Sequence, residues 1–181
     1  MKHNNKFIYP KTVRETIEGK RHYNINDKEK LPSVTTILSK TSPKEKEEGL
    51  RKWREKMGEE NATRIVDEAA ARGTAMHKIL ERYIGEEGYL DLTAVGQNAH
   101  VDFKQTNKPK KREWIDDYCL QLAAYGMAHD YVHKTKINKA VIMMCSKDNY
   151  YQEFIIEGEE YKKYKHKWLA RVNQYYEKTK K

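Results

Sequence analysis

The stretch VDFKQTNKPKKREWIDDYCLQLAAY, residues 101–125, predicts a strand, a basic loop and a helix in direct succession. The apolar residues between Val101 and Thr106 are spaced as in a short strand, in which alternate side chains share a face. Asp102 and Lys104 can therefore reach one site. A carboxylate there can hold Mg²⁺ or Mn²⁺ beside a phosphate, and an ammonium can position or help deprotonate an attacking water. The alternative is a random surface ion pair, since 35% of the residues are charged.

Residues 114–130 predict a helix, because their apolar side chains recur at helical spacing and two acids suit the first turn. The apolar stripe consists of Ile115, Tyr118, Leu122 and Tyr125, and the acids are Asp116 and Asp117. Gln121 and Tyr125 are four residues apart and share one helical face, where an amide and a phenol can line a channel for nucleic acid. The alternative places Tyr125 in the core and Gln121 at its boundary.

Residues 72–84, RGTAMHKILERYI, predict a helix that begins at Gly73 and Thr74. His77 and Glu81 are one turn apart on it, so an imidazole and a carboxylate can share a metal or water site. A lone histidine on a helix is more often no ligand at all.

The order GTAMHKILE, VDFKQT and QLAAY resembles the RecB-type branch of the PD-(D/E)XK nucleases. The preceding segment is similar to the start of the mitochondrial genome maintenance exonuclease group and its tailed-phage relatives; it reads LPSVTTILSKTSPKEKEEGLRKWREKMGEENATRIVDEAAARGTAMH. The resemblance covers roughly residues 31–176. It implies a mixed α/β (α+β) fold, in which helices flank a small mixed sheet with a restriction-endonuclease-like core. It also implies a DNA exonuclease that uses Mg²⁺ or Mn²⁺.

The resemblance assigns roles by position to a metal site, a catalytic lysine and a DNA-facing helix. The metal ligands are His77 and Asp102, the lysine is Lys104, the helix residues are Gln121 and Tyr125, and Glu81 is a further acid of the catalytic group.

The chain departs from the family pattern before Asp102. Family members carry another acid, in a GxxD motif, on a strand that pairs with the strand of the aspartate and lysine. Only GEEGYLDLTAVGQNAHV separates the predicted helix from Asp102, which barely holds two short strands, so we expect an abbreviated core. Asp91 satisfies the GxxD string and can replace the missing metal ligand if its segment forms a short strand. In the reading that we favour, residues 91–100 continue a helical connection, Asp91 is a cap or a solvated acid, and cation binding is weakened or lost.

The chain length of 181 residues suits one compact nuclease-like domain, residues 31–181, preceded by an N-terminal hairpin or extension, residues 1–30. The net charge of +9 favours an anionic partner, although solvated lysine-rich helices produce the same balance. A basic loop with one indole follows the predicted strand and suits phosphates and an unpaired base, which favours single-stranded DNA. Its residues are Lys108, Lys110, Lys111, Arg112 and Trp114. Trp114 can instead anchor the helix start in the core.

Two widely spaced cysteines, Cys119 and Cys145, and the lack of a secretory segment lead us to expect reduced thiols in a cytoplasm, that of the host if a phage encodes the chain. We expect a monomer. We also expect no membrane span, because the apolar stretches are far shorter than about twenty residues.

The remaining segments predict a hairpin around Glu18 and Gly19 and helices over about 34–39, 59–71 and 159–178. They also predict a charged helix after Pro43, with Leu50 and Trp53 turned inward. Residues 140–145 and 150–156 predict a second hairpin that extends the sheet of Asp102. Two functions follow as hypotheses: a metal-dependent exonuclease of single-stranded DNA, or a noncatalytic remnant that binds nucleic acid and lacks a complete metal site.

Overall fold

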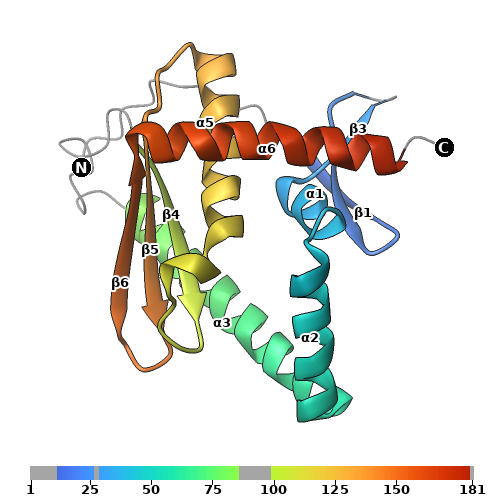
Figure 1. Cartoon of the computed structure of the whole chain (residues 1–181). Helices are drawn as coiled ribbons and strands as arrows, with labels where there is room; N and C mark the ends of the chain where they lie inside the picture. Colours follow the sequence, from blue (N-terminus) through green and yellow to red (C-terminus); the bar gives the residue numbers. More distant parts are fainter. Residues whose placement is uncertain (1–11, 27–28, 86–98, 180–181) are drawn as a thin grey trace.

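The computed structural model describes residues 12–26, 29–85 and 99–179, and in two of these segments, at residues 81–85 and 99–100, it describes the backbone alone. Helices flank two three-stranded sheets, which confirms the predicted mixed α/β class (Figure 1). The elements in chain order are β1 (Val13–Ile17), β2 (Lys20–Asn24), β3 (Lys30–Pro32), α1 (Val34–Lys40), α2 (Lys44–Met57), α3 (Glu59–Gly85), β4 (Ala99–Thr106), the 3₁₀ helix η1 (Arg112–Trp114), α5 (Asp116–His133), β5 (Lys139–Ser146), β6 (Tyr151–Glu157) and α6 (Gly158–Thr179).

The sheet that carries Asp102 has the strand order β4-β5-β6. Its first two strands are parallel, and parallel neighbours need a crossover, which η1 and α5 supply. β5 and β6 are antiparallel and joined by the predicted turn, in which the Asn149 N–H donates to the Ser146 carbonyl over 3.0 Å. The structure thus confirms the predicted strand, helix and hairpin, and also that the hairpin extends the sheet.

The register of this sheet decides which face the charged pair occupies. Asp102 lies opposite Ile142 and Lys104 opposite Met144, and both of these apolar side chains are fully buried. Leu122 on α5 is fully buried in the same core cluster, and α6 crosses α5 (Figure 1). Asp102 and Lys104 therefore stand at the margin of the core, on the face that α5 covers.

The N-terminal sheet has the order β1-β2-β3, and its first two strands form the predicted hairpin. Glu18 and Gly19 have φ values of 49° and 72°, the paired positive values of a tight hairpin turn. The third strand was not predicted. Arg21 fastens this sheet to α1, because its carbonyl accepts from the Ser33 N–H and the Thr36 hydroxyl, each over 2.9 Å.

The prediction of a helix start at Gly73 and Thr74 is wrong, because α3 runs unbroken through both residues. The Thr74 hydroxyl donates back to the Ala70 carbonyl over 3.0 Å instead of capping a new helix. The surrounding alanine-rich sequence has a high helix propensity, which outweighs the cost of one glycine, about 1 kcal/mol.

The prediction that Leu50 turns inward is also wrong, since its side chain is 55% exposed. None of the α2 residues is buried, and Trp53 is only partly covered. Ion pairs one turn apart, such as Arg51 with Glu55 at 2.6 Å, occupy the surface of α2. α3 is the neighbour of α2 in the fold, and the junction of the two helices projects away from the sheets, whereas α3 runs back to β4 (Figure 1). No second layer covers Leu50.

Candidate active site

Four of the predicted site residues lie in one connected chain of polar contacts. The Nζ atom of Lys104 is 2.7 Å from Oδ2 of Asp102 and donates to Oε1 of Gln121 over 3.0 Å. The Nε2 atom of Gln121 donates to the Tyr125 hydroxyl oxygen over 2.8 Å. The strand pair and the helix pair, which the sequence predicts separately, therefore form one site.

This site is partly shielded from solvent. The side chains of Asp102 and Lys104 are 14% and 17% exposed, so their attraction is screened less than that of a surface pair. Oδ2 of Asp102 is buried and forms its ion pair with the Lys104 ammonium at 2.7 Å. A carboxylate has several lone-pair sites, so Asp102 can accept from a further group while it is paired with Lys104.

Two tyrosines of α5 flank the charged pair. Burial raises the pKa of Tyr118, and the negative charge of Asp102 raises it further. Burial likewise raises the pKa of Tyr125, an effect that the hydrogen bond from Gln121 partly offsets. The Tyr118 ring also lies 5.1 Å from Nζ of Lys104, within cation–π range. Both phenols are therefore protonated at neutral pH and act through hydrogen bonds and ring faces, not as bases. In the sequence, Tyr118 is recognisable only as part of an apolar stripe, and its contact with Lys104 was not predicted.

α3 is tied to the end of the Asp102 strand, because the Arg72 guanidinium donates to the Asn107 side-chain oxygen. His77 follows Arg72 by five residues, a rise of roughly 7.5 Å along the helix, and its side chain is exposed. Among the side chains that the structure describes, no three from His, Cys, Asp or Glu gather closely enough to hold a metal ion. The Glu81 side chain and all of Asp91 lie outside what the structure describes, so the metal ligands stay predictions.

The basic loop is fixed to β6 through its backbone. The Lys110 N–H donates to Oε1 of Gln152 over 2.7 Å, and Nε2 of Gln152 donates back to the Lys110 carbonyl over 3.0 Å. The Thr106 hydroxyl donates to the Lys108 carbonyl over 2.9 Å. These bonds leave the Lys108 ammonium exposed at the end of the strand.

At the end of the loop, Lys111 and Trp114 are exposed, whereas Arg112 is paired with a residue of α6. Trp114 is 58% exposed, which contradicts the alternative that it anchors the core. The Nζ atom of Lys111 lies 5.4 Å from the Trp114 ring centroid, so an indole and an ammonium stand together at the surface. Arg112 forms an ion pair with Glu160 on α6, and it therefore ties η1 to the scaffold.

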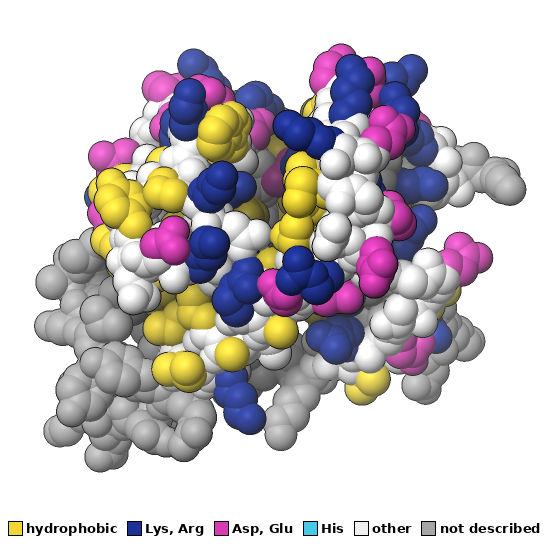
Figure 2. Space-filling view, turned by 90° about the horizontal axis from the view of Figure 1, so that it is seen from below, with side chains coloured by type: hydrophobic (Ala, Val, Ile, Leu, Met, Phe, Trp, Pro, Cys, Tyr) yellow, Lys and Arg dark blue, Asp and Glu magenta, His cyan; other side chains and the backbone are white. Residues whose placement is uncertain are grey.

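Lys and Arg side chains are spread over the face seen in Figure 2, interspersed with Asp and Glu. Hydrophobic side chains show in the hollow between the two sides of this face. This face therefore carries charges of both signs, and the net charge of +9 belongs to the chain as a whole.

A pocket of about 390 Å³ lies beside Tyr125, between this tyrosine, the N-terminal sheet and the start of α1. Arg21 and Tyr23 on β2 and Thr35 on α1 are among its lining residues. No local pattern in the sequence indicates this pocket, because it depends on how α1 holds the N-terminal sheet beside α5.

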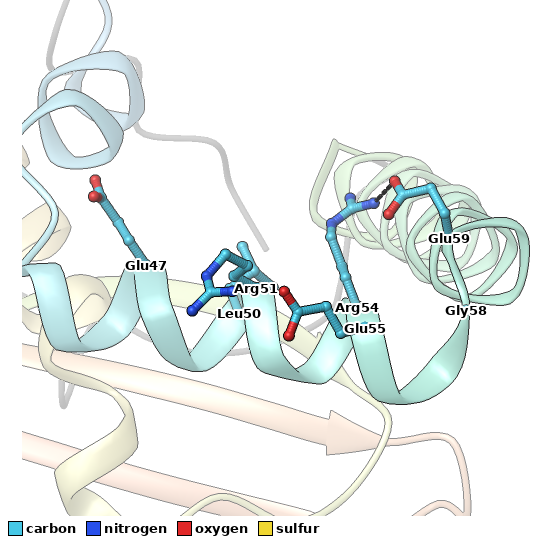
Figure 3. Close-up of a pocket in the computed structure, with 7 residues that line it drawn as sticks. All are labelled: Glu47, Leu50, Arg51, Arg54, Glu55, Gly58 and Glu59. Carbon is cyan, nitrogen blue, oxygen red and sulfur yellow. Dashed lines mark hydrogen bonds and ion pairs between the residues drawn. The ribbon is translucent and has the colours of Figure 1, made fainter.

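A second pocket, of about 500 Å³, lies at the junction of α2 and α3 (Figure 3). Its charged side chains are largely paired with one another, Arg51 with Glu55 and Arg54 with Glu59. None of the predicted site residues lines it, and we assign no chemistry to it.

In the part of the chain that the structure describes, no helix is both long enough and apolar enough to cross a membrane.

No protein-family model matches the chain. Among curated proteins, the chain is similar to mitochondrial genome maintenance exonuclease 1 of Mus musculus, with 27% identity over 204 residues. The match includes 83% of this chain and 60% of the mouse protein, so the chain spans less than two thirds of that relative. The aligned length exceeds the 181 residues of this chain, so the alignment places some residues of the relative opposite gaps. The similarity to an exonuclease thus extends over most of the chain.

Proposed function

We propose that this chain is a metal-dependent DNA exonuclease of the PD-(D/E)XK type, which hydrolyses phosphodiester bonds of single-stranded DNA. The observation that carries the proposal is the chain of contacts from Asp102 through Lys104 and Gln121 to Tyr125. The similarity to a mouse exonuclease supports nuclease activity in general.

The carboxylate of Asp102 suits a hard divalent cation, which prefers carboxylate oxygens. His77 and Asp91 are the further ligands that the sequence offers, and Glu81 is a further acid. A bound Mg²⁺ or Mn²⁺ supplies Lewis acidity and lowers the pKa of a coordinated water.

The ammonium of Lys104 is held between a carboxylate and an amide oxygen. Because an ammonium carries three N–H donors, Lys104 can contact a phosphate oxygen or the attacking water while its bond to Gln121 persists. Its charge opposes the negative charge that develops on the phosphate in the transition state. Gln121 acts as a positioning residue, since it links the lysine to the phenol of Tyr125.

The test is to separate cutting from binding with Lys104→Ala. We expect cleavage to fall by at least about 100-fold, the usual effect of removing a group that stabilises transition-state charge. Affinity for single-stranded DNA without metal should change by less than about threefold, since one phosphate contact contributes little. Lys136→Ala is the matched control, because it removes the same charge from an exposed position. Equal cleavage by wild type and Lys104→Ala would contradict the assignment.

A protein that binds nucleic acid without cutting it is the second candidate. It is favoured by one observation: the described residues place a single carboxylate, Asp102, at the centre of the site and gather no three metal-binding side chains. Calorimetric titration with Mn²⁺ distinguishes the two functions. The exonuclease should bind the ion in a manner that Asp102→Asn weakens, whereas the remnant should bind DNA and release no heat with Mn²⁺.

A further inference from the structure

The pocket beside Tyr125 begins where the contact chain from Lys104 ends. Tyr125 accepts the hydrogen bond from Gln121 and is also one of the pocket's lining residues. Any group in this pocket therefore lies two side chains away from the candidate catalytic lysine.

The lining of this pocket combines apolar, aromatic and polar groups. Leu31 and Val34 supply aliphatic surface, Tyr23 supplies a ring, and Ser33 and Thr35 supply hydroxyl groups. This combination suits a flat heterocycle with polar edges, which binds through an aromatic or apolar face for stacking and a few hydrogen-bonding groups at the rim.

Arg21 adds a positive charge to the same lining. Among the described residues its guanidinium forms no ion pair, and its side chain is exposed. Alternation along β2 puts Arg21 and Tyr23 on one face of the strand. Both lie close enough to influence the pKa of Tyr125, which Arg21 lowers and Tyr23 raises. A phosphate that precedes or follows a bound base can therefore reach the guanidinium.

We propose that this pocket holds one unpaired base of single-stranded DNA, beside the phosphate that lies at Asp102 and Lys104. The inference rests on the proposed function and adds to it a place where one base of the single strand binds. A base in a duplex must first unpair and unstack, which costs free energy, so the pocket favours single strands over double strands. Its volume of about 390 Å³ falls near the lower end for small-molecule sites, as a single base with its sugar requires.

The test is an abasic scan. Binding is measured without metal to a series of single-stranded oligonucleotides, each of which lacks one base at a different position. For the wild type we expect about tenfold weaker binding when one particular position is abasic, and little change elsewhere, because stacking of one base contributes about 1–3 kcal/mol. Tyr23→Ala should bind the intact strand about tenfold more weakly and show no further loss at that position.

Three variants control the result. Tyr23→Phe keeps the ring and should behave like the wild type, and Tyr131→Ala removes a tyrosine that is 79% exposed at the far end of α5 and should also have no effect. Thr35→Trp fills the pocket from α1 without changing Tyr23, and should reproduce the loss even if Tyr23→Ala fails to fold.

The outcomes separate the pocket from the nuclease. An abasic profile without a sensitive position, or a sensitive position that persists in Tyr23→Ala or Thr35→Trp, overturns the base pocket even if the wild type cuts DNA. A sensitive position that disappears in these variants, in a protein that does not cut DNA with Mg²⁺, supports the pocket and contradicts the proposed function alone.

Discussion

Gly126 on α5 allows close packing between α5 and Tyr161 on α6. A Cβ atom added at this glycine would lie closer than 3.0 Å to the Tyr161 hydroxyl oxygen and 3.2 Å from Cγ2 of Ile137. Tyr161 is only 2% exposed, and its hydroxyl has no hydrogen-bond partner among the described residues. We therefore predict that Gly126→Ala destabilises the protein through the Tyr161 hydroxyl.

The magnitude follows from two opposing effects. Overpacking in a core costs about 1–3 kcal/mol, whereas alanine in a helix gains about 1 kcal/mol over glycine. Because the added Cβ would meet a buried oxygen closer than 3.0 Å, we expect the steric cost to dominate. The net loss in the free energy of unfolding should be about 1–2 kcal/mol, a fall in Tm of roughly 2–8 °C for a chain of this size.

Tyr161→Phe should remove the cause of that loss. The variant deletes a buried hydroxyl without a partner, so it should be neutral or stabilising on its own. In the double variant the nearest remaining ring atom, Cζ, is 3.4 Å from the added Cβ, an ordinary contact. We expect urea unfolding to show a coupling energy of at least about 1 kcal/mol between the two changes.

Gly73→Ala is the matched control, because this glycine also lies within a helix and an added Cβ would meet nothing within 4 Å. It should stabilise the protein by about 0.5–1 kcal/mol. A double variant that is as unstable as Gly126→Ala alone would refute the packing argument. The packing bears on the site because Gly126 follows Tyr125, so a shift of α5 moves the end of the contact chain.

Two further predictions concern α5. Gln121→Leu deletes both the acceptor of Lys104 and the donor to Tyr125; cleavage should fall about tenfold or more with little change in Tm, and equal rates would show that the lysine needs no positioning. Burial raises the pKa of the Cys119 thiol to about 11. The unfolded chain loses this proton nearer the ordinary thiol pKa, so the stabilising contribution is complete below that value and is lost as the pH rises toward 11. Unfolding measured between pH 8 and 11 should show a smaller decline in stability for Cys119→Ala than for the wild type, and equal declines would contradict the assignment.

The strand, the hairpin and α5 could be predicted because local spacing determines them. Asp102 and Lys104 share a face in any strand, and Gln121 and Tyr125 share a face in any helix. Local spacing alone does not show that the face of the strand and the face of the helix meet. That depends on the parallel crossover, which places Asp102 opposite Ile142 and turns its face toward α5.

The failed predictions concern features that distant packing determines. Gly73 and Thr74 carry the local signals of a helix start, but α3 continues through them because the flanking sequence is strongly helical. Leu50 is apolar and spaced for burial, but no second layer covers α2. The pocket beside Tyr125 was not predicted, because it brings together residues that are about a hundred positions apart in the chain.

The most direct test of the central claim is a time course with end-labelled single-stranded DNA and the wild-type protein, in Mg²⁺ or Mn²⁺ and in EDTA. We predict progressive loss of the strand with either metal and an intact strand in EDTA. A strand that stays intact with both metals, while the protein still binds it, would contradict the claim that Asp102 and Lys104 form a working hydrolytic site.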